Sequence, residues 1–375
     1  MATPPNASAS FDMCLKQLAR SGWEAAAANF LALWQQHPLD LKFGLMAGAG
    51  LIHTGQEDAG AALLSFLADR GHIIRTAQFN PAVETPLREA SALADVTIRK
   101  TFTRLQVQAI DACTDAGRIR SAIWPQTHDG PPPFPKSTTP PDRTRPRPYV
   151  FYAPDLPPID VFETASWTEK LGAQADIIRS EFLAMMTKDS GRGAPYVPAE
   201  SPFGADWSRL KGQTHWKAVH LYKDYQRQPA AVDCPLTCAA LNDVPITRQN
   251  GMPIEAFFSV LAPQTTIPPH YGLANARVTV HLPLIVPSSD AKICGIRVGQ
   301  NTHSWTPARP FIFDDSFDHS AWNLSEDSRV VLIFEAWRPD MTQGEINAVK
   351  ASYEAREAYT KHRGDVLKTL AQAAS

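Results

Sequence analysis

The stretch from Ser259 to Arg329 decides the fold of the second half of this chain. Its centre reads Pro269-His270-Tyr271-Gly272 and, further on, Asp318-His319. Between the two histidines, Ala276-Arg277-Val278-Thr279-Val280-His281-Leu282 alternates apolar and polar residues, which predicts a half-buried strand. On such a strand Arg277, Thr279 and His281 share one face. A second alternating run, Ser328–Phe334, follows His319 and carries Arg329 near its start.

Two histidines on separate strands, with an arginine ten residues after the second, are typical of a mononuclear iron oxygenase. Neutral imidazoles suit Fe(II), and the planar guanidinium of Arg329 suits a carboxylate of a co-substrate. A lone histidine is more often a core or surface residue than a metal ligand, so the spacing alone leaves both interpretations of His270 and His319 open.

Length and composition limit the number of folded units, the possible partners and the cellular location. A chain of 375 residues with 44% hydrophobic residues predicts two folded units, and a net charge of −2 gives no sign of a nucleic-acid partner. Met1–Ser10 lacks the basic and apolar segments of a signal peptide, and no apolar run is long enough to span a membrane. We therefore expect a cytoplasmic protein with no membrane partner and with reduced cysteines. Cys234 and Cys238 form an isolated C-x-x-x-C, which is a weak zinc signal.

After a disordered N-terminus over residues 1–10, residues 11–123 are predicted to be helical. The expected helices are Phe11–Arg20, Trp23–Gln36, Leu39–His53, Gln56–Asp69 and Leu87 to about Ile119. Helix pairs with short glycine breaks resemble tetratricopeptide-type repeats, although the consensus is poorly matched. Either a helical module that packs on the catalytic domain or a platform for a peptide or partner fits this pattern.

Residues 124–148 are rich in proline and lack periodicity, which predicts a linker or a surface strap. The second unit, residues 149–341, begins with a helix over Trp167–Met186. Strands are then predicted in the Trp207–Tyr225 region and over Ala256–Ala262, Ala291–Val298 and Arg309–Phe313, and a turn over Thr265–Pro269 delivers His270. Many short strands after a helix indicate an α+β chain with a jelly-roll-like domain. Residues 342–375 are predicted to form a C-terminal helix with a Thr342-x-x-Glu345 capping box.

From about Arg145 to Thr342 the chain resembles the aspartyl/asparaginyl β-hydroxylase family of Fe(II)/2-oxoglutarate oxygenases. The resemblance rests on Phe258-Ser259-Val260, Pro269-His270-x-Gly272, Arg277-x-Thr279-x-His281-Leu282, Phe313-Asp314-Asp315-Ser316-Phe317-Asp318-His319-x-x-Trp322, Arg329 and Ala336-Trp337-x-Pro339. This set, in order and at matching spacing, is specific, whereas a lone His-x-Gly would not be.

The resemblance implies a double-stranded β-helix (cupin-like) domain and a hydroxylase that uses Fe(II), 2-oxoglutarate and O₂ and releases succinate and CO₂. It also implies the site residues: His270 and His319 match the metal ligands, and Ser259, His281 and Arg329 match residues that engage 2-oxoglutarate. Arg277 matches a basic residue that lines the active site.

Two positions bear on the substrate. Many oxygenases of this class have a carboxylate two residues after the first histidine, where this chain has Gly272, as in the protein-directed branch of the family. Those protein hydroxylases carry a second arginine where this chain has Thr279, and threonine cannot supply a fixed positive charge.

Three functions therefore stay open. The first is hydroxylation of an Asp- or Asn-type side chain of a protein or peptide at Cβ. The second is hydroxylation of a free or carrier-tethered amino acid or other small molecule, and the third is a binding protein on a degenerate scaffold. Intact His270, His319 and Arg329 argue against the third. Asp314 and Asp315 are interpreted as structural because Asp is favoured locally in turns. Asp318 is interpreted as structural because, on an extended chain, its side chain would point away from that of its neighbour His319. The sequence does not predict an oligomeric state.

Overall fold

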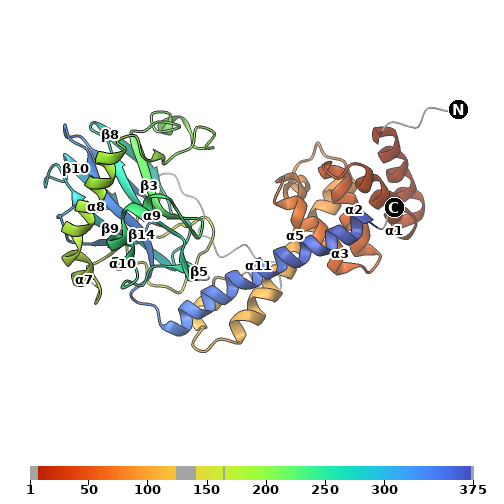
Figure 1. The fold of residues 1–375 in the computed structure, drawn as a ribbon. Helices are drawn as coiled ribbons and strands as arrows, with labels where there is room; N and C mark the ends of the chain where they lie inside the picture. The colour runs from red at the N-terminus through yellow and green to blue at the C-terminus, as the bar shows by residue number, and fades with distance from the viewer. Residues whose placement is uncertain (1–6, 124–140, 164, 250, 373–375) are drawn as a thin grey trace. The chain divides into compact units, whose positions relative to one another are not determined.

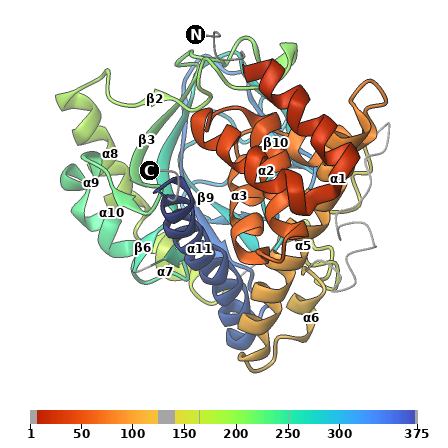
Figure 2. The same cartoon turned by 90° about the vertical axis from the view of Figure 1, so that its right-hand side faces the viewer.

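The computed structural model describes residues 7–123, 141–163, 165–249 and 251–372. These residues form two compact units, one helical and one that combines two β-sheets with helices. Figure 1 shows both units, and Figure 2 shows the same ribbon turned by a quarter turn. No helix in the described ranges is both long and apolar enough to cross a bilayer.

The helices of the first unit pack around one apolar core. Its elements are α1 Ala7–Gln36, α2 Leu41–His53, α3 Glu57–Ala68, α4 Ile73–Thr76, a short 3₁₀ turn Ala77–Phe79, α5 Thr85–Asp111 and most of α11 Gln343–Gln372. Asp40 caps α2 by accepting hydrogen bonds from the amides of Lys42 and Phe43. The end of α11 joins this core, where the amide of Gln35 donates to the carbonyl of Leu370 over 2.7 Å.

Several helix predictions need correction. Ala7–Ser10 is helical and not disordered, while residues 1–6 lie outside the described residues. The predicted helix Leu87–Ile119 ends at Asp111, and α6 Gly117–Arg120 follows it. Asp115, with φ of 56°, interrupts the helical backbone between the two. The predicted linker 124–148 lies outside the described residues up to residue 140.

The second unit contains an antiparallel eight-stranded sheet in the order β1-β12-β9-β14-β7-β3-β2, with β4 beside β3. Its strands are β1 Val161–Phe162, β2 Ala194–Pro195, β3 Trp216–Lys223, β4 Gln226–Arg227, β7 Glu255–Leu261, β9 Arg277–Ile285, β12 Phe311–Phe313 and β14 Arg329–Trp337. The strand predictions over Ala256–Ala262, Ala276–Leu282 and Ser328–Phe334 are confirmed because these runs become β7, β9 and β14.

A four-stranded antiparallel sheet has the order β11-β10-β13-β8, and a small hairpin joins β5 Arg248–Gln249 to β6 Met252–Pro253. The strands of the four-stranded sheet are β8 Thr265–His270, β10 Cys294–Val298, β11 Asn301–Ser304 and β13 His319–Asn323. The predicted turn over Thr265–Pro269 is wrong, since these residues belong to β8. β8 is an edge strand, where Pro268 and Pro269 are tolerated because their missing N–H groups are not needed for pairing.

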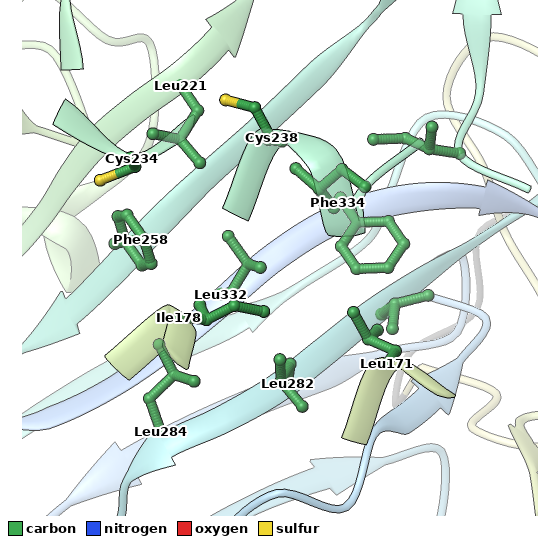
Figure 3. Packing of buried hydrophobic residues seen from close by; sticks show 14 of the residues in the cluster. Leu171, Ile178, Leu221, Cys234, Cys238, Phe258, Leu282, Leu284, Leu332 and Phe334 are labelled. Atoms are coloured by element: carbon green, nitrogen blue, oxygen red, sulfur yellow. The ribbon is translucent and has the colours of Figure 1, made fainter. Parts of the chain in front are cut away.

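The two faces of the eight-stranded sheet have different neighbours. One face packs on helices α7 Thr168–Ala173, α8 Ala175–Lys188, α9 Ala230–Asp233 and α10 Pro235–Ala240. Figure 3 shows Leu171 and Ile178 of these helices beside Leu282 and Leu332 of the strands. The predicted single helix Trp167–Met186 is in fact two helices that meet at Gln174. The other face shares an apolar core with the four-stranded sheet.

Candidate active site

A cavity opens between the two sheets of the second unit, and residues of both sheets line it. The eight-stranded sheet contributes the inward-facing residues of β3, β7, β9 and β14. The four-stranded sheet contributes His270 of β8 and His319 of β13. Five of the six site residues predicted from the sequence line this cavity: Ser259, His270, His281, His319 and Arg329.

His270 and His319 lie directly opposite each other in the antiparallel pairing of β8 and β13. Their ring centroids are 4.0 Å apart. Nδ1 of His270 lies 2.8 Å from the carbonyl oxygen of Pro268, and Nδ1 of His319 lies 3.0 Å from that of Phe317. A carbonyl oxygen only accepts, so each Nδ1 is the protonated nitrogen and each Nε2 carries the lone pair. This is the tautomer and the outer hydrogen bond found in metal-binding histidines.

Both imidazoles are held neutral. Burial, followed by the neighbouring His319, lowers the pKa of His270 to about 3. Burial lowers the pKa of His319 to about 4. A metal ion therefore finds two unprotonated nitrogens without displacing protons from them. The described residues contain no group of three or more His, Cys, Asp or Glu side chains arranged to hold a metal. His270 and His319 are two candidate metal ligands in this cavity.

Arg329 and Ser259 form a buried cationic corner at one end of the cavity. Arg329 is only 1% exposed, and its guanidinium lies over the ring of Trp305 at 4.6 Å from the centroid. Its Nη2 donates to the hydroxyl of Ser259 over 3.3 Å, and the indole of Trp216 donates to the same oxygen over 3.0 Å. Among the described residues, no partner meets Nε or Nη1 of Arg329. A buried charge with two unused donors calls for an anionic ligand.

His281 completes this corner. Its side chain is 6% exposed, stacks with Trp305 at 6.0 Å and contacts Phe313 edge-on at 5.1 Å. Burial, and then the charge of Arg329, lowers its pKa well below the ordinary value, so the ring is neutral. Nδ1 has no hydrogen-bond partner within the described part of the chain. We call Ser259, His281 and Arg329 the arginine end of the cavity.

Contrary to the prediction from the sequence, Arg277 does not line the cavity. Its Nη1 lies 2.6 Å from Oε2 of Glu335 on the neighbouring strand β14, and the guanidinium acts from beside the cavity. Thr279, on the same face of β9, lines the cavity and hydrogen-bonds to Asp315. The position that the resemblance assigns to a second arginine therefore helps to hold a carboxylate.

Asp315 corrects the prediction that the three aspartates are structural. It lines the cavity beside Gly272, where a Cβ on Gly272 would overlap its carboxylate. Burial raises the pKa of Asp315 to about 6. The other two are structural as predicted: Asp314 pairs with Arg338 at 3.1 Å, and Asp318 pairs with Arg297 at 2.5 Å.

Two further acidic residues in the lining, Glu255 of β7 and Glu335 of β14, were not predicted from the sequence. Nε2 of His220 lies 2.9 Å from Glu255, and Arg277 pairs with Glu335. Burial raises the pKa of Glu335 to about 7, although the charge of Arg277 partly opposes this. Strand periodicity points to both glutamates. Glu255 lies four residues before Ser259, and Glu335 lies six residues after Arg329. Residues an even number of positions apart on a strand share a face, so each glutamate faces the same side as its site residue. We call Glu255, Asp315 and Glu335 the acidic end.

All five cysteines are free, in agreement with the prediction of reduced thiols. Cys234 and Cys238 are buried in the core between the helices and the sheet, and Figure 3 shows them there. They belong to packing and not to the candidate site.

The part of the chain that contains this cavity is similar to known proteins. A family model described as "Aspartyl/Asparaginyl beta-hydroxylase" matches residues 173–339. The human protein "Aspartyl/asparaginyl beta-hydroxylase" is 30% identical over 169 residues, which cover 44% of this chain and 20% of that protein. The "Ornithine lipid ester-linked acyl 2-hydroxylase" of Rhizobium tropici is 30% identical over 187 residues, which cover 49% of this chain and 61% of that protein. The chain thus spans less than two thirds of either relative.

A solved structure of a prolyl-4-hydroxylase from Pseudomonas putida has a TM-score of 0.30 and 11% identity, and covers 46% of this chain and 98% of its own. At that score the likeness does not establish a shared fold.

Proposed function

Because residues 173–339 belong to the aspartyl/asparaginyl β-hydroxylase family, we propose that this chain is an Fe(II)- and 2-oxoglutarate-dependent hydroxylase. The observation that carries the proposal is the facing pair His270 and His319, both neutral and both with Nδ1 bonded to a backbone carbonyl. Beside them, Arg329 offers two unused, buried N–H donors to an anion.

In this proposal His270 and His319 hold Fe(II) through their Nε2 atoms. Arg329, with Ser259 and His281, holds a carboxylate of 2-oxoglutarate. When bound, iron and 2-oxoglutarate together with O₂ supply the chemistry that turns a C–H bond of the substrate into C–OH and the co-substrate into succinate and CO₂. The chain positions the reactants and excludes bulk water.

The chain's own residues make this positioning rigid. The backbone carbonyls of Pro268 and Phe317 fix the two imidazole rings, so a metal would meet donors that are already oriented. The indole of Trp216 donates a hydrogen bond to Ser259, and the ring of Trp305 packs against the guanidinium of Arg329. Asp315 places a carboxylate on the side that Gly272 leaves open.

Two kinds of substrate are candidates for this chain. One is an aspartyl or asparaginyl side chain of a protein or peptide, hydroxylated at Cβ, which is the kind that the human relative's name gives. The other is a free or carrier-tethered amino acid or other small molecule, which is favoured by Thr279 where protein-directed relatives carry an arginine. Both candidates use the same reaction.

The fold and domain assignments belong to the same proposal. Two antiparallel sheets that share a core are consistent with a double-stranded β-helix over residues 149–341. Residues 11–123 would be a TPR-like helical domain, because α1 packs on α2 and α2 on α3 in chain order. Residues 124–148 would link the two domains.

The test is an anaerobic titration of the metal-free full chain with Fe(II) and 2-oxoglutarate, followed by the visible charge-transfer absorption of the chelate and by thermal stabilisation. We expect a band in the wild type. His270→Ala should lose iron binding, and Arg329→Ala should keep iron binding but lose 2-oxoglutarate. Arg309→Ala, an exposed arginine outside the cavity, is the matched control and should behave as the wild type. A wild type with no band and no stabilisation by either ligand would refute the proposal.

A further inference from the structure

The strand register separates the two ends of the cavity. On the eight-stranded sheet, Ile333 of β14 lies opposite both His281 and Phe257. Two residues further along β14, Glu335 lies opposite Thr279. The acidic end is therefore one inward-facing row beyond His281 and on the side away from Arg329, with His270 and His319 on the facing sheet.

Each carboxylate of the acidic end has only partial compensation. Glu335 pairs with Arg277, Glu255 with the imidazole of His220, and Asp315 with the hydroxyl of Thr279. Arg277 lies beside the cavity, and its guanidinium opposes the rise in the pKa values of both Asp315 and Glu335. Lys223, directly opposite Glu255 in the pairing of β3 and β7, is exposed. Three carboxylates against the guanidinium of Arg277 and the ammonium of Lys223 leave the acidic end net negative.

The three carboxylates converge on an aromatic wall. Burial first, and then the charges of the three carboxylates, raise the pKa of the Tyr196 hydroxyl, so all three lie within electrostatic reach of that ring. Tyr196 stacks on Trp216 at 4.1 Å and on Phe257 at 5.2 Å, and all three rings line the cavity. Aromatic faces beside carboxylates attract ammonium and guanidinium groups through cation–π interaction.

The unpartnered, buried polar atoms at the opposite end independently indicate that a ligand binds in the cavity. Arg329 is 1% exposed with two unused donors, and His281 is 6% exposed with an unpartnered Nδ1, counted over the described residues. An anion at the arginine end and a cation at the acidic end complete a cavity whose two ends carry opposite charge. Desolvated charges without partners are costly, so each end favours a ligand of the opposite sign.

We propose that the substrate group that enters this site carries a positive charge, an ammonium or a guanidinium, bound by Glu255 and Glu335 with Asp315 and the ring of Tyr196. The inference rests on the proposed hydroxylase function and names its substrate class. An aspartyl carboxylate would meet like charge at this end, so a basic amino-acid side chain is the preferred substrate. The shared chemistry is a basic side chain, which a peptide or a free amino acid can supply.

The test measures binding to the full chain loaded anaerobically with Fe(II) and 2-oxoglutarate. One arm uses capped Gly-Xaa-Gly peptides in which Xaa is arginine, lysine, citrulline, aspartate or asparagine. The other arm uses the five free amino acids. Citrulline is the neutral isostere of arginine, so the comparison isolates charge. We expect arginine or lysine to bind at least tenfold more tightly than citrulline and aspartate in one arm, and that arm identifies the source.

The variants Glu255→Gln and Glu335→Gln should each reduce this preference about tenfold, which corresponds to about 1.4 kcal/mol, while iron and 2-oxoglutarate binding persist. Glu200→Gln, an exposed glutamate outside the cavity, should leave the preference unchanged. Equal affinity for charged and neutral probes, no measurable affinity for any probe, tighter binding of aspartate, or an unchanged preference in both variants would overturn the inference. Failure of the wild type to bind iron and 2-oxoglutarate would instead overturn the proposed function, because that step precedes any probe.

Discussion

The guanidinium of Arg277 on β9 lies 2.6 Å from the carboxylate of Glu335 on β14, and the pair borders the acidic end of the cavity. The side chains are 11% and 23% exposed, so the pair is mostly desolvated. Arg277 therefore compensates a carboxylate of the chain itself and is not left open toward a substrate carboxylate. This relationship supports the proposal that the site receives a basic side chain and not an acidic one.

Replacing Arg277 should destabilise the fold in a pH-dependent manner. Burial raises the pKa of Glu335 to about 7 from its ordinary 4.5, and Arg277 keeps that pKa from rising further. A raised pKa favours the protonated form in the folded state, so this contribution to stability is complete below pH 4.5 and is lost as the pH rises through about 7. Without Arg277 the pKa of Glu335 would rise further, so more stability would be lost at high pH. We expect Arg277→Gln to lower the free energy of unfolding by about 1–3 kcal/mol at pH 8 and by less at pH 5.

Urea denaturation at the two pH values measures this difference. Arg179→Gln provides the control, since Arg179 is 45% exposed and pairs with the exposed Asp176. An Arg277→Gln penalty that is equal at both pH values would show that the pair does not control the ionisation of Glu335.

Gly272 should be intolerant of any side chain for a reason that lies in Asp315. A Cβ at residue 272 would overlap the Asp315 carboxylate, and the amide of Gly272 donates to the carbonyl of Asp315 over 2.6 Å, which ties the two segments together. We expect Gly272→Ala to cost about 1–3 kcal/mol of stability by overpacking and to weaken Fe(II) binding at the adjacent His270. Thermal unfolding and iron titration report the two effects.

The double variant Gly272→Ala/Asp315→Gly should recover most of the lost stability, because it removes the overlapping carboxylate. Gly204→Ala is the matched control, since nothing lies within 4 Å of a Cβ there. If the double variant is as unstable as Gly272→Ala alone, the clash with Asp315 is not the cause.

Ser259 should matter for both stability and co-substrate binding. Its hydroxyl accepts from the indole of Trp216 and from Arg329, and it is fully buried. Ser259→Ala leaves the indole without an acceptor, so we expect a loss of about 1–3 kcal/mol of stability and weaker 2-oxoglutarate binding by about tenfold. Calorimetric titration with 2-oxoglutarate under anaerobic conditions measures the second effect. Ser180→Ala, on an exposed helix face, should change neither quantity, and an unchanged affinity in Ser259→Ala would remove this serine from the co-substrate site.

Much of the site could be predicted from the sequence because its information is local. The alternation in Ala276–Leu282 and Ser328–Phe334 determines which side chains share a face, and this places His281 and Arg329 in one cavity. The motif around His319 likewise places a histidine opposite His270. Strand periodicity was strong enough to predict Glu335 as well, but an acidic residue on a strand face carries no sign of function until the cavity is known.

Other features could not be predicted because they depend on contacts distant in the sequence. Asp315 was interpreted as a turn residue, since nothing in its neighbours shows that it would lie against Gly272. The strand β8 was predicted as a turn because its prolines oppose strand formation, and only the edge position in the four-stranded sheet makes them acceptable. The partner of Arg277 likewise depends on the register between β9 and β14.

The start of α11 provides a prediction with the opposite pH dependence. The capping box predicted from the sequence is confirmed: the amide of Thr342 donates to Glu345 over 2.9 Å, and the amide of Glu345 donates to the Thr342 hydroxyl over 3.2 Å. Glu345 is also held by Arg118, with Nε 2.6 Å from Oε1 and Nη2 2.7 Å from Oε2. The hydrogen bond from Arg118 lowers the pKa of Glu345 from its ordinary 4.5.

A lowered pKa favours the ionised form in the folded state, so the stabilisation is present above pH 4.5 and is lost as the pH falls through the folded-state pKa. The Glu345 side chain is 4% exposed but Arg118 is 34% exposed, which reduces the electrostatic gain. We expect Glu345→Gln to cost about 1–2 kcal/mol at pH 7 and little at pH 3, measured by denaturant unfolding. Thr342→Ala should cost about 1 kcal/mol at both pH values because its hydroxyl does not titrate. A Glu345→Gln penalty that persists undiminished at pH 3 would assign the effect to packing and not to the charged pair.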